Sequence, residues 1–144
     1  MTPSETFDVL MYLRAGMPNA FLKLTEADTD AMVALWAEMF RDYPGGDVMA
    51  AAKTYIWRDT TQRFPGPGNI RPILEEVQEA IDHYSCGIEY LGASSAKYPS
   101  NVREYIIARA KERYESRTGL PFRSPTERLA LLNQRMLTDG RTGA

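Results

Sequence analysis

His83 and Cys86, three residues apart, are the residues whose types and spacing come closest to catalytic chemistry. A histidine can accept the proton of a cysteine thiol, and the resulting thiolate is a strong nucleophile. Such a pair needs a third group that orients the histidine, and Asp82 is the nearby residue that looks suited to this role. Cys86, however, opens a stretch with glycines and serines that gives poor support for fixed geometry. We therefore expect that the protein is not an enzyme.

The other residue types do not favour a metal, a cofactor or a nucleotide. His83 is the only histidine, which excludes a multi-histidine metal site. The sequence GPGN at 66–69 lacks the lysine and the hydroxyl residue of a phosphate-binding P-loop. Most acidic groups near one another fall in or near the first turns of expected helices, where they complement the helix dipole: Asp28 and Asp30, and Glu75, Glu76 and Glu79. We expect no metal site and no cofactor.

Apolar residues recur with a helical period along much of the chain, and no stretch alternates as a strand would. The pattern predicts four helices over about 3–15, 26–43, 47–62 and 70–84. The second carries the clearest apolar stripe, which we expect to be buried: Met32, Leu35, Trp36, Met39, Phe40 and Tyr43. Short connections favour a compact four-helix bundle over residues 1–85.

The stretch RFPGPGNIRP at 63–72 separates the third and fourth expected helices. Its prolines cannot continue a helix, and its glycines permit a sharp reversal of the chain. We expect Asn69 to cap the following helix. Phe64 and Ile70 are then expected to pack together across the turn.

The C-terminal part is predicted to hold one or two further helices. Residues 86–100 contain two glycines and three serines without a sustained period, which predicts a linker. Helices are expected over about 100–117 and from Ser124 onward, where a capping box precedes an apolar face: Leu129, Leu132 and Met136. The predicted organisation is all-α, with a helical bundle (1–85), a linker (86–100) and a basic helical segment (101–144).

Charge and hydropathy limit the location and the partners. Residues 1–85 carry 7 Lys and Arg against 13 Asp and Glu, a net charge of −6, whereas residues 86–144 carry 10 against 6, a net charge of +4. This asymmetry suits two modules with different partners, or two solvated surfaces that differ in composition. No apolar run approaches the roughly 18 residues of a membrane span, and the N-terminus does not resemble a signal peptide. We expect a cytoplasmic protein without a membrane partner.

Two regions have the residue types of a binding surface. Arg109 and Arg113 lie among tyrosines in the expected helix at 100–117, which suits weak nucleic-acid binding. The interleaved glutamates of that helix equally suit salt bridges along it. In the third helix, Trp57 lies off the apolar face beside Arg58, and both residue types are favoured interface anchors. A position at the edge of the bundle would explain Trp57 equally well.

Three segments follow a pattern that we recognise: DAMVALWAEMFRDYP in the second helix, AAKTYIWRDTTQRFP at the end of the third, and GNIRPILEEVQ at the start of the fourth. With them, residues 1–85 resemble the small helicase loader–inhibitor family of Bacillus phages. The positions that match are Trp36, Phe40, Asp42, Tyr43, Tyr55, Phe64, Pro65, Pro67, Ile70 and Ile73. Gly66 departs from the pattern, because the family tends to have the two prolines adjacent.

The resemblance implies an adaptor that has no chemistry of its own. Such proteins bind a hexameric DnaB-type helicase, restrain it off DNA and release it at an origin through a phage initiator protein. They combine a helical N-terminal domain with a mobile C-terminal segment that contacts the helicase. We therefore expect a phage or prophage replication adaptor in a bacterial cytoplasm. The expected partner-binding residues are Arg109, Arg113, Leu129, Leu132 and Met136, with Trp57 and Arg58 as a second face.

Two other functions stay open at this point. The protein could inhibit a host machine, with the acidic part acting as a nucleic-acid mimic through Asp28, Asp30, Glu75 and Glu79. It could also be a DNA-binding accessory protein that acts through the basic helix near 100–117.

Overall fold

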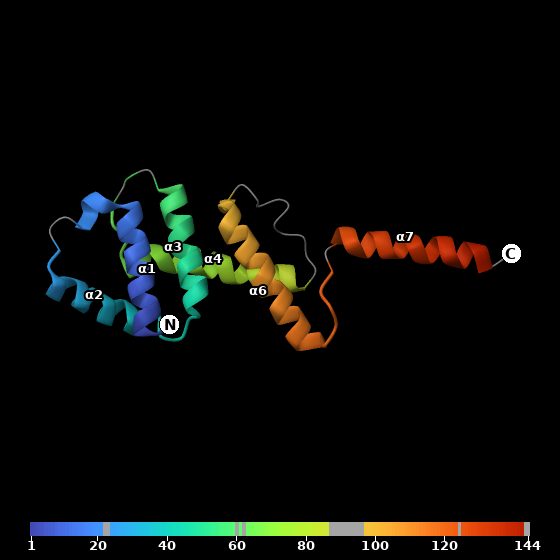
Figure 1. The fold of residues 1–144 in the computed structure, drawn as a ribbon, viewed down its shortest axis with the longest axis horizontal. Coiled ribbons are helices and arrows are strands. Elements are labelled where there is room, and N and C mark those ends of the chain that lie inside the picture. The colour runs from blue at the N-terminus through green and yellow to red at the C-terminus, as the bar shows by residue number, and fades with distance from the viewer. Residues whose placement is uncertain (22–23, 60, 62, 87–96, 124, 143–144) are drawn as a thin grey trace.

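The computed structural model describes residues 1–21, 24–59, 61, 63–86, 97–123 and 125–142 (Figure 1). These residues form six α-helices and one short 3-10 helix, and they contain no strand. The helices are α1 (Pro3–Gly16), η1 (Pro18–Phe21), α2 (Glu26–Met39), α3 (Gly45–Arg58), α4 (Pro67–Ser85), α6 (Ser100–Thr118) and α7 (Pro125–Thr142). The predicted all-α fold class is confirmed.

The first two long helices begin with reciprocal capping boxes. The Thr2 hydroxyl accepts a hydrogen bond from the Glu5 backbone N–H, and the Glu5 carboxylate accepts one from the Thr2 N–H. Thr25 and Asp28 repeat the arrangement at the start of α2. These bonds hold the pKa of Asp28 below its usual value. Since each box satisfies backbone N–H groups that have no partner within the helix, both start points follow from the local sequence.

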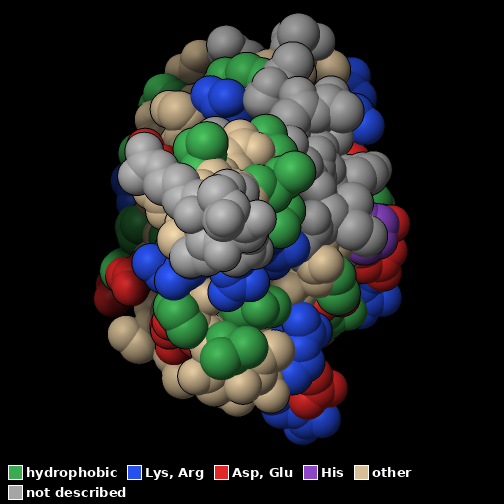
Figure 2. All heavy atoms as spheres, turned by 90° about the vertical axis from the view of Figure 1, so that its right-hand side faces the viewer, with side chains coloured by type: hydrophobic (Ala, Val, Ile, Leu, Met, Phe, Trp, Pro, Cys, Tyr) green, Lys and Arg blue, Asp and Glu red, His purple; other side chains and the backbone are tan. Residues whose placement is uncertain are grey.

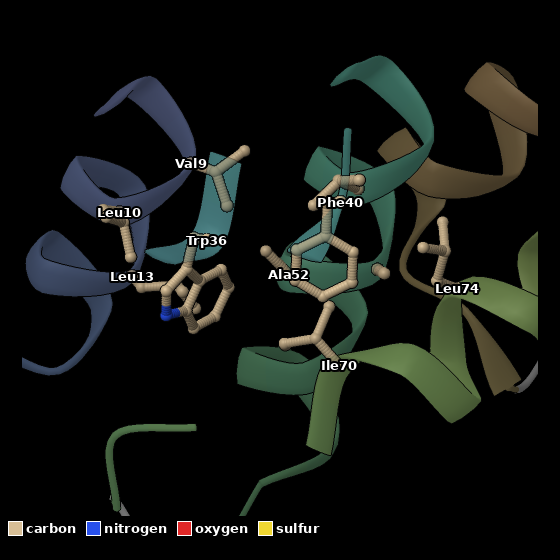
Figure 3. Packing of buried hydrophobic residues seen from close by; sticks show 10 residues of the cluster. Val9, Leu10, Leu13, Trp36, Phe40, Ala52, Ile70 and Leu74 are labelled. Atoms are coloured by element: carbon tan, nitrogen blue, oxygen red, sulfur yellow. The ribbon is translucent and has the colours of Figure 1, made fainter. Parts of the chain in front are cut away.

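Helices α1 to α4 share one hydrophobic cluster (Figure 3). Trp36 and Phe40 belong to it, with only 2 % and 1 % of their surfaces exposed and their ring centroids 5.6 Å apart. Burying a side chain of this kind stabilises the fold by about 2–3 kcal/mol. The other buried members are Val9, Leu10 and Leu13 of α1, Val48, Ala51 and Ala52 of α3, and Ile70 and Leu74 of α4.

The apolar stripe expected on the second helix is only partly buried. Leu35 is 51 % exposed and Met39 is 41 % exposed, although both lie within the stripe. The helix also ends at Met39, four residues earlier than predicted, with Phe40 as its C-cap. The stripe is wider than the surface that the other helices cover, so α2 keeps an apolar strip facing outward.

The break before α4 differs in detail from the prediction. The helix begins at Pro67 with Gly66 as N-cap, so Asn69 is the third helical residue and not the cap. Its side chain accepts a hydrogen bond from the Gly66 N–H at 3.0 Å. Asn69 therefore still satisfies a backbone donor at the helix start, but from inside the first turn.

Phe64 and Ile70 lie in the same hydrophobic cluster, one partly buried and the other fully buried. The Phe64 ring centroid lies 6.0 Å from that of Trp36, with the rings tilted. The hydroxyl of Tyr55, near the end of α3, also donates to the Arg63 carbonyl oxygen at 3.0 Å. The proline-rich turn is thus anchored to the core on both sides.

Helix α6 extends the core beyond α4, and the two helices cross in Figure 1. Val102, Ile106 and Ala110 of α6 are fully buried in a second cluster with the face of α4 that carries Val77 and Ile81. The packing therefore continues past residue 85, where the predicted bundle domain ends. Most of the expected linker, residues 87–96, lies outside the described residues.

Phe122 fixes the chain where it leaves α6. Its ring centroid lies 5.4 Å from that of Tyr84 and 5.4 Å from that of Tyr114, so it joins α4 to the end of α6. Helix α7 then projects away from the other helices and ends at the far extremity of the molecule (Figure 1). None of its described side chains is buried.

Candidate partner-binding surface

Helix α7 carries the most exposed apolar face among the described residues. Leu129, Leu132 and Met136 recur at i, i+3 and i+7, which places them on one side of a helix. They are between 55 % and 72 % exposed. In Figure 2, green hydrophobic and blue basic side chains lie next to one another on the end of the molecule where α7 projects. A helix that carries such an apolar stripe is stabilised when the stripe packs against another surface.

Arginines border this apolar stripe. Arg128 and Arg135, seven residues apart, lie beside Leu132 along one edge of the helix. Together with Arg123 and Leu131 they line a shallow depression that also includes Leu132. A surface that combines leucines with guanidinium groups suits an apolar partner surface with an acidic border. The expected cap of this helix, Ser124, lies outside the described residues.

Arg109 is placed quite differently from the α7 residues. Its Nε lies 3.7 Å from a carboxylate oxygen of Asp47, and its Nη1 donates to Glu112 at 2.9 Å. The bond to Glu112 raises the pKa of Arg109 above its usual value. The side chain is about one third exposed, and its charge is largely used within the molecule.

The carboxylate of Asp47 is fully buried and joins three helices. Asp47 lies in the first turn of α3, and Tyr105 of α6 donates its hydroxyl hydrogen to it at 2.5 Å. The Gln78 side chain of α4 donates to the second oxygen at 3.5 Å. Burial and the bond to Asp47 raise the pKa of Tyr105 far above its usual value, so the phenol stays a donor. Helical spacing places Tyr105 and Arg109 on one face, four residues apart, but no sequence pattern points to Asp47 as their partner.

Arg113 and Arg117 also bind α6 to α4. Arg113 pairs with the Asp82 carboxylate, and Arg117 donates to the Ser85 backbone carbonyl at 3.1 Å. The second bond satisfies a carbonyl at the C-terminal end of α4, where a positive charge is favourable. Two expected partner-binding residues, Arg109 and Arg113, therefore hold α6 against the other helices.

Trp57 and Arg58 also differ in their environments: Trp57 is exposed, whereas Arg58 binds groups of the same chain. Trp57 is 52 % exposed on α3, as its position off the apolar face indicated. Arg58 instead donates to Glu76 of α4 at 2.8 Å and to the Lys97 carbonyl at 2.9 Å, and it stacks on the ring of Tyr98. Of this pair, only Trp57 presents most of its side chain to solvent.

His83 and Cys86 lie at the C-terminal end of α4. His83 lies with its Nε2 3.8 Å from Glu79, one turn earlier on α4, and Cys86 is exposed at the end of that helix. In the described part of the chain, no three His, Cys, Asp or Glu residues gather as a metal site requires. None of the described helices is both long and apolar enough to cross a membrane.

Comparisons with protein-family models, with curated proteins and with solved structures found no match for this chain. The candidate partner-binding surface is the apolar stripe of α7, which is bordered by arginines and projects from the helical body.

Proposed function

We propose that this protein is a phage or prophage DNA-replication adaptor that binds a hexameric DnaB-type replicative helicase and loads or restrains it. In this proposal residues 1–85 act as a four-helix bundle, and a phage initiator protein is a second partner. The adaptor works in the bacterial cytoplasm and catalyses no reaction. The helicase as partner rests on the resemblance of residues 1–85 to the phage loader–inhibitor family.

The observation that carries an adaptor function is the exposed face of α7. Leu129, Leu132 and Met136 of the helix α7 are exposed to solvent. Large apolar side chains that are exposed together usually mark an interaction surface. A helix of this type binds by laying its apolar stripe into a groove, with anchors spaced at i, i+3 and i+7. We therefore assign the main partner contact to α7.

The remaining expected contact residues have unequal roles in this proposal. Trp57 is available as a second anchor because its ring is half exposed. Arg58, Arg109 and Arg113 are less available to a partner, since their guanidinium groups bind acidic groups of the same chain. Direct DNA binding through α6 is less favoured for the same reason.

A pull-down with purified DnaB-type helicase in the presence of nucleotide tests the proposal. We expect the full chain to bind and the double variant Leu132→Asp/Met136→Asp to bind at least about tenfold more weakly. Leu120→Asp is the matched control, because Leu120 is also 59 % exposed but lies outside α7. Absence of binding by the full chain would refute the helicase assignment. Equal binding by the α7 double variant and the wild type would refute the assignment of α7.

A second candidate function is inhibition of a host machine by nucleic-acid mimicry. All four acidic residues expected to serve it, Asp28, Asp30, Glu75 and Glu79, are exposed. A mimic presents such carboxylates to a basic channel that normally binds phosphates. Reversing these four charges would abolish inhibition by a mimic, whereas an adaptor that acts through α7 would keep its binding.

A further inference from the structure

Two helix faces at opposite ends of the molecule carry apolar residues together with charges of opposite sign (Figure 1). The first, called here the acidic α2 face, consists of Asp28, Ala31, Leu35, Glu38 and Met39, all exposed. The second, called here the basic α7 face, consists of Arg128, Leu129, Leu132, Arg135 and Met136. In both, the spacing of three, four and seven residues places the members on one side of the helix.

Each face combines an apolar stripe with charges of one sign. On α2, Leu35 and Met39 are 51 % and 41 % exposed, and the acids Asp28 and Glu38 lie on the same side of the helix. On α7, Arg128 and Arg135 lie about 10 Å apart along the helix axis beside Leu132. Asp28 and Glu38 are about 15 Å apart on α2, a separation that two long arginine side chains can span. Packing the two stripes together would pair these charges at the border of the contact.

The two faces of one chain are far from each other. In Figure 1, α2 lies at one end of the longest axis and α7 at the other, with α3, α4 and α6 between them. The basic α7 face therefore meets an acidic α2 face most directly on another molecule. When two copies lie side by side with their long axes antiparallel, each α7 face can contact the α2 face of the other copy. The contact is then made twice, and the assembly stops at a dimer.

We propose that the basic α7 face of one copy docks on the acidic α2 face of a second copy, in a reciprocal and reversible dimer. The dimer covers the same α7 face that the proposed function assigns to the partner, so self-association and partner binding compete. The contact is small, because each half consists of two helices, and weak association is expected. Added salt weakens the dimer, since its border consists of opposite charges.

Sedimentation equilibrium of the full chain over a range of concentrations tests the proposal. We expect the average mass to rise towards that of a dimer as concentration increases, and to fall again on addition of salt. Leu35→Asp and Met136→Asp should each weaken association by at least about tenfold. Leu120→Asp, a change of the same type outside both faces, should associate as the wild type does.

Mixing the two defective chains gives the sharpest result. The Leu35→Asp chain keeps an unaltered α7 face and the Met136→Asp chain keeps an unaltered α2 face, so their one-to-one heterodimer retains one of the two contacts intact. Every contact in either homodimer is altered, so the mixture should associate more strongly than either variant alone. If either variant is unfolded by circular dichroism, Glu38→Arg and Arg135→Glu replace them, with the same expected complementation. A monomeric wild type at all concentrations, or a mixture that associates no more strongly than either variant alone, would overturn the proposal. Because no helicase is present, this result is independent of the pull-down.

Discussion

At the scale of single residues, Asp47 shows how one buried charge organises the tertiary structure. Its carboxylate receives the Tyr105 hydroxyl at 2.5 Å and the Gln78 amide at 3.5 Å, with Arg109 at 3.7 Å. A buried carboxylate without such donors would be strongly unfavourable, so these contacts constrain how α6 meets α3 and α4. The arginines that suggested nucleic-acid binding in the sequence thus have acidic partners within the chain.

Tyr105→Phe should lower the free energy of unfolding by about 1–2 kcal/mol at neutral pH, because it removes a donor to a buried carboxylate. The pKa of Tyr105 is raised by folding. Wild-type stability is therefore lost as pH rises above about 10, where the phenol ionises in the unfolded chain first. The variant has no phenol at this position and does not lose stability in this way. Urea denaturation at increasing pH should therefore show that the difference in free energy of unfolding between the wild type and the variant becomes smaller. A constant difference would contradict the role given to this phenol.

At the scale of elements, the turn before α4 and the docking of α6 decide how the helices are arranged. Phe64 and Ile70 connect the turn to the cluster around Trp36. Val102, Ile106 and Ala110 connect α6 to the second hydrophobic cluster on α4. Both are contacts between residues distant in sequence, which local helix signals do not specify.

Phe64→Ala should lower the free energy of unfolding by about 2 kcal/mol, less than the roughly 3–5 kcal/mol for a fully buried aromatic residue, because the ring is only partly buried. Phe7→Ala is the matched control, since Phe7 is 48 % exposed on α1. It should cost less than about 1 kcal/mol. Urea denaturation monitored by circular dichroism measures both. Equal midpoints for Phe64→Ala and the wild type would show that the turn is not anchored by this ring.

At the scale of the whole molecule, the chain has a packed body that ends near Phe122 and a helix that stands apart from it. The body spans α1 to α6, and its two hydrophobic clusters meet along α3 and α4. Helix α7 adds exposed apolar surface and no buried side chain among those described. Stability and partner binding are therefore expected to reside in different parts of the chain.

Two truncations test this division. A chain that ends after residue 123 should keep its free energy of unfolding within about 1 kcal/mol of the full chain, because α7 buries little. A chain that ends after residue 85 should lose about 4 kcal/mol or more, since Val77 and Ile81 become exposed and Ile106 is absent. Thermal melts of both chains measure the outcome. Equal stability of the two truncated chains would mean that α6 is not part of the body.

Local sequence signals specify most of the helices. Capping boxes at Thr2 and Thr25 and helical apolar periods specify where most helices lie, because these signals act between residues three or four positions apart. The exposed stripe of α7 was also readable, since Leu129, Leu132 and Met136 define it by spacing alone. By contrast, the packing of the helices places Leu35 and Met39 outward and pairs Arg109 and Arg113 with acids of the same chain. The exposure of these side chains and their ion pairs depend on how the helices pack, because packing joins residues that are far apart in the chain.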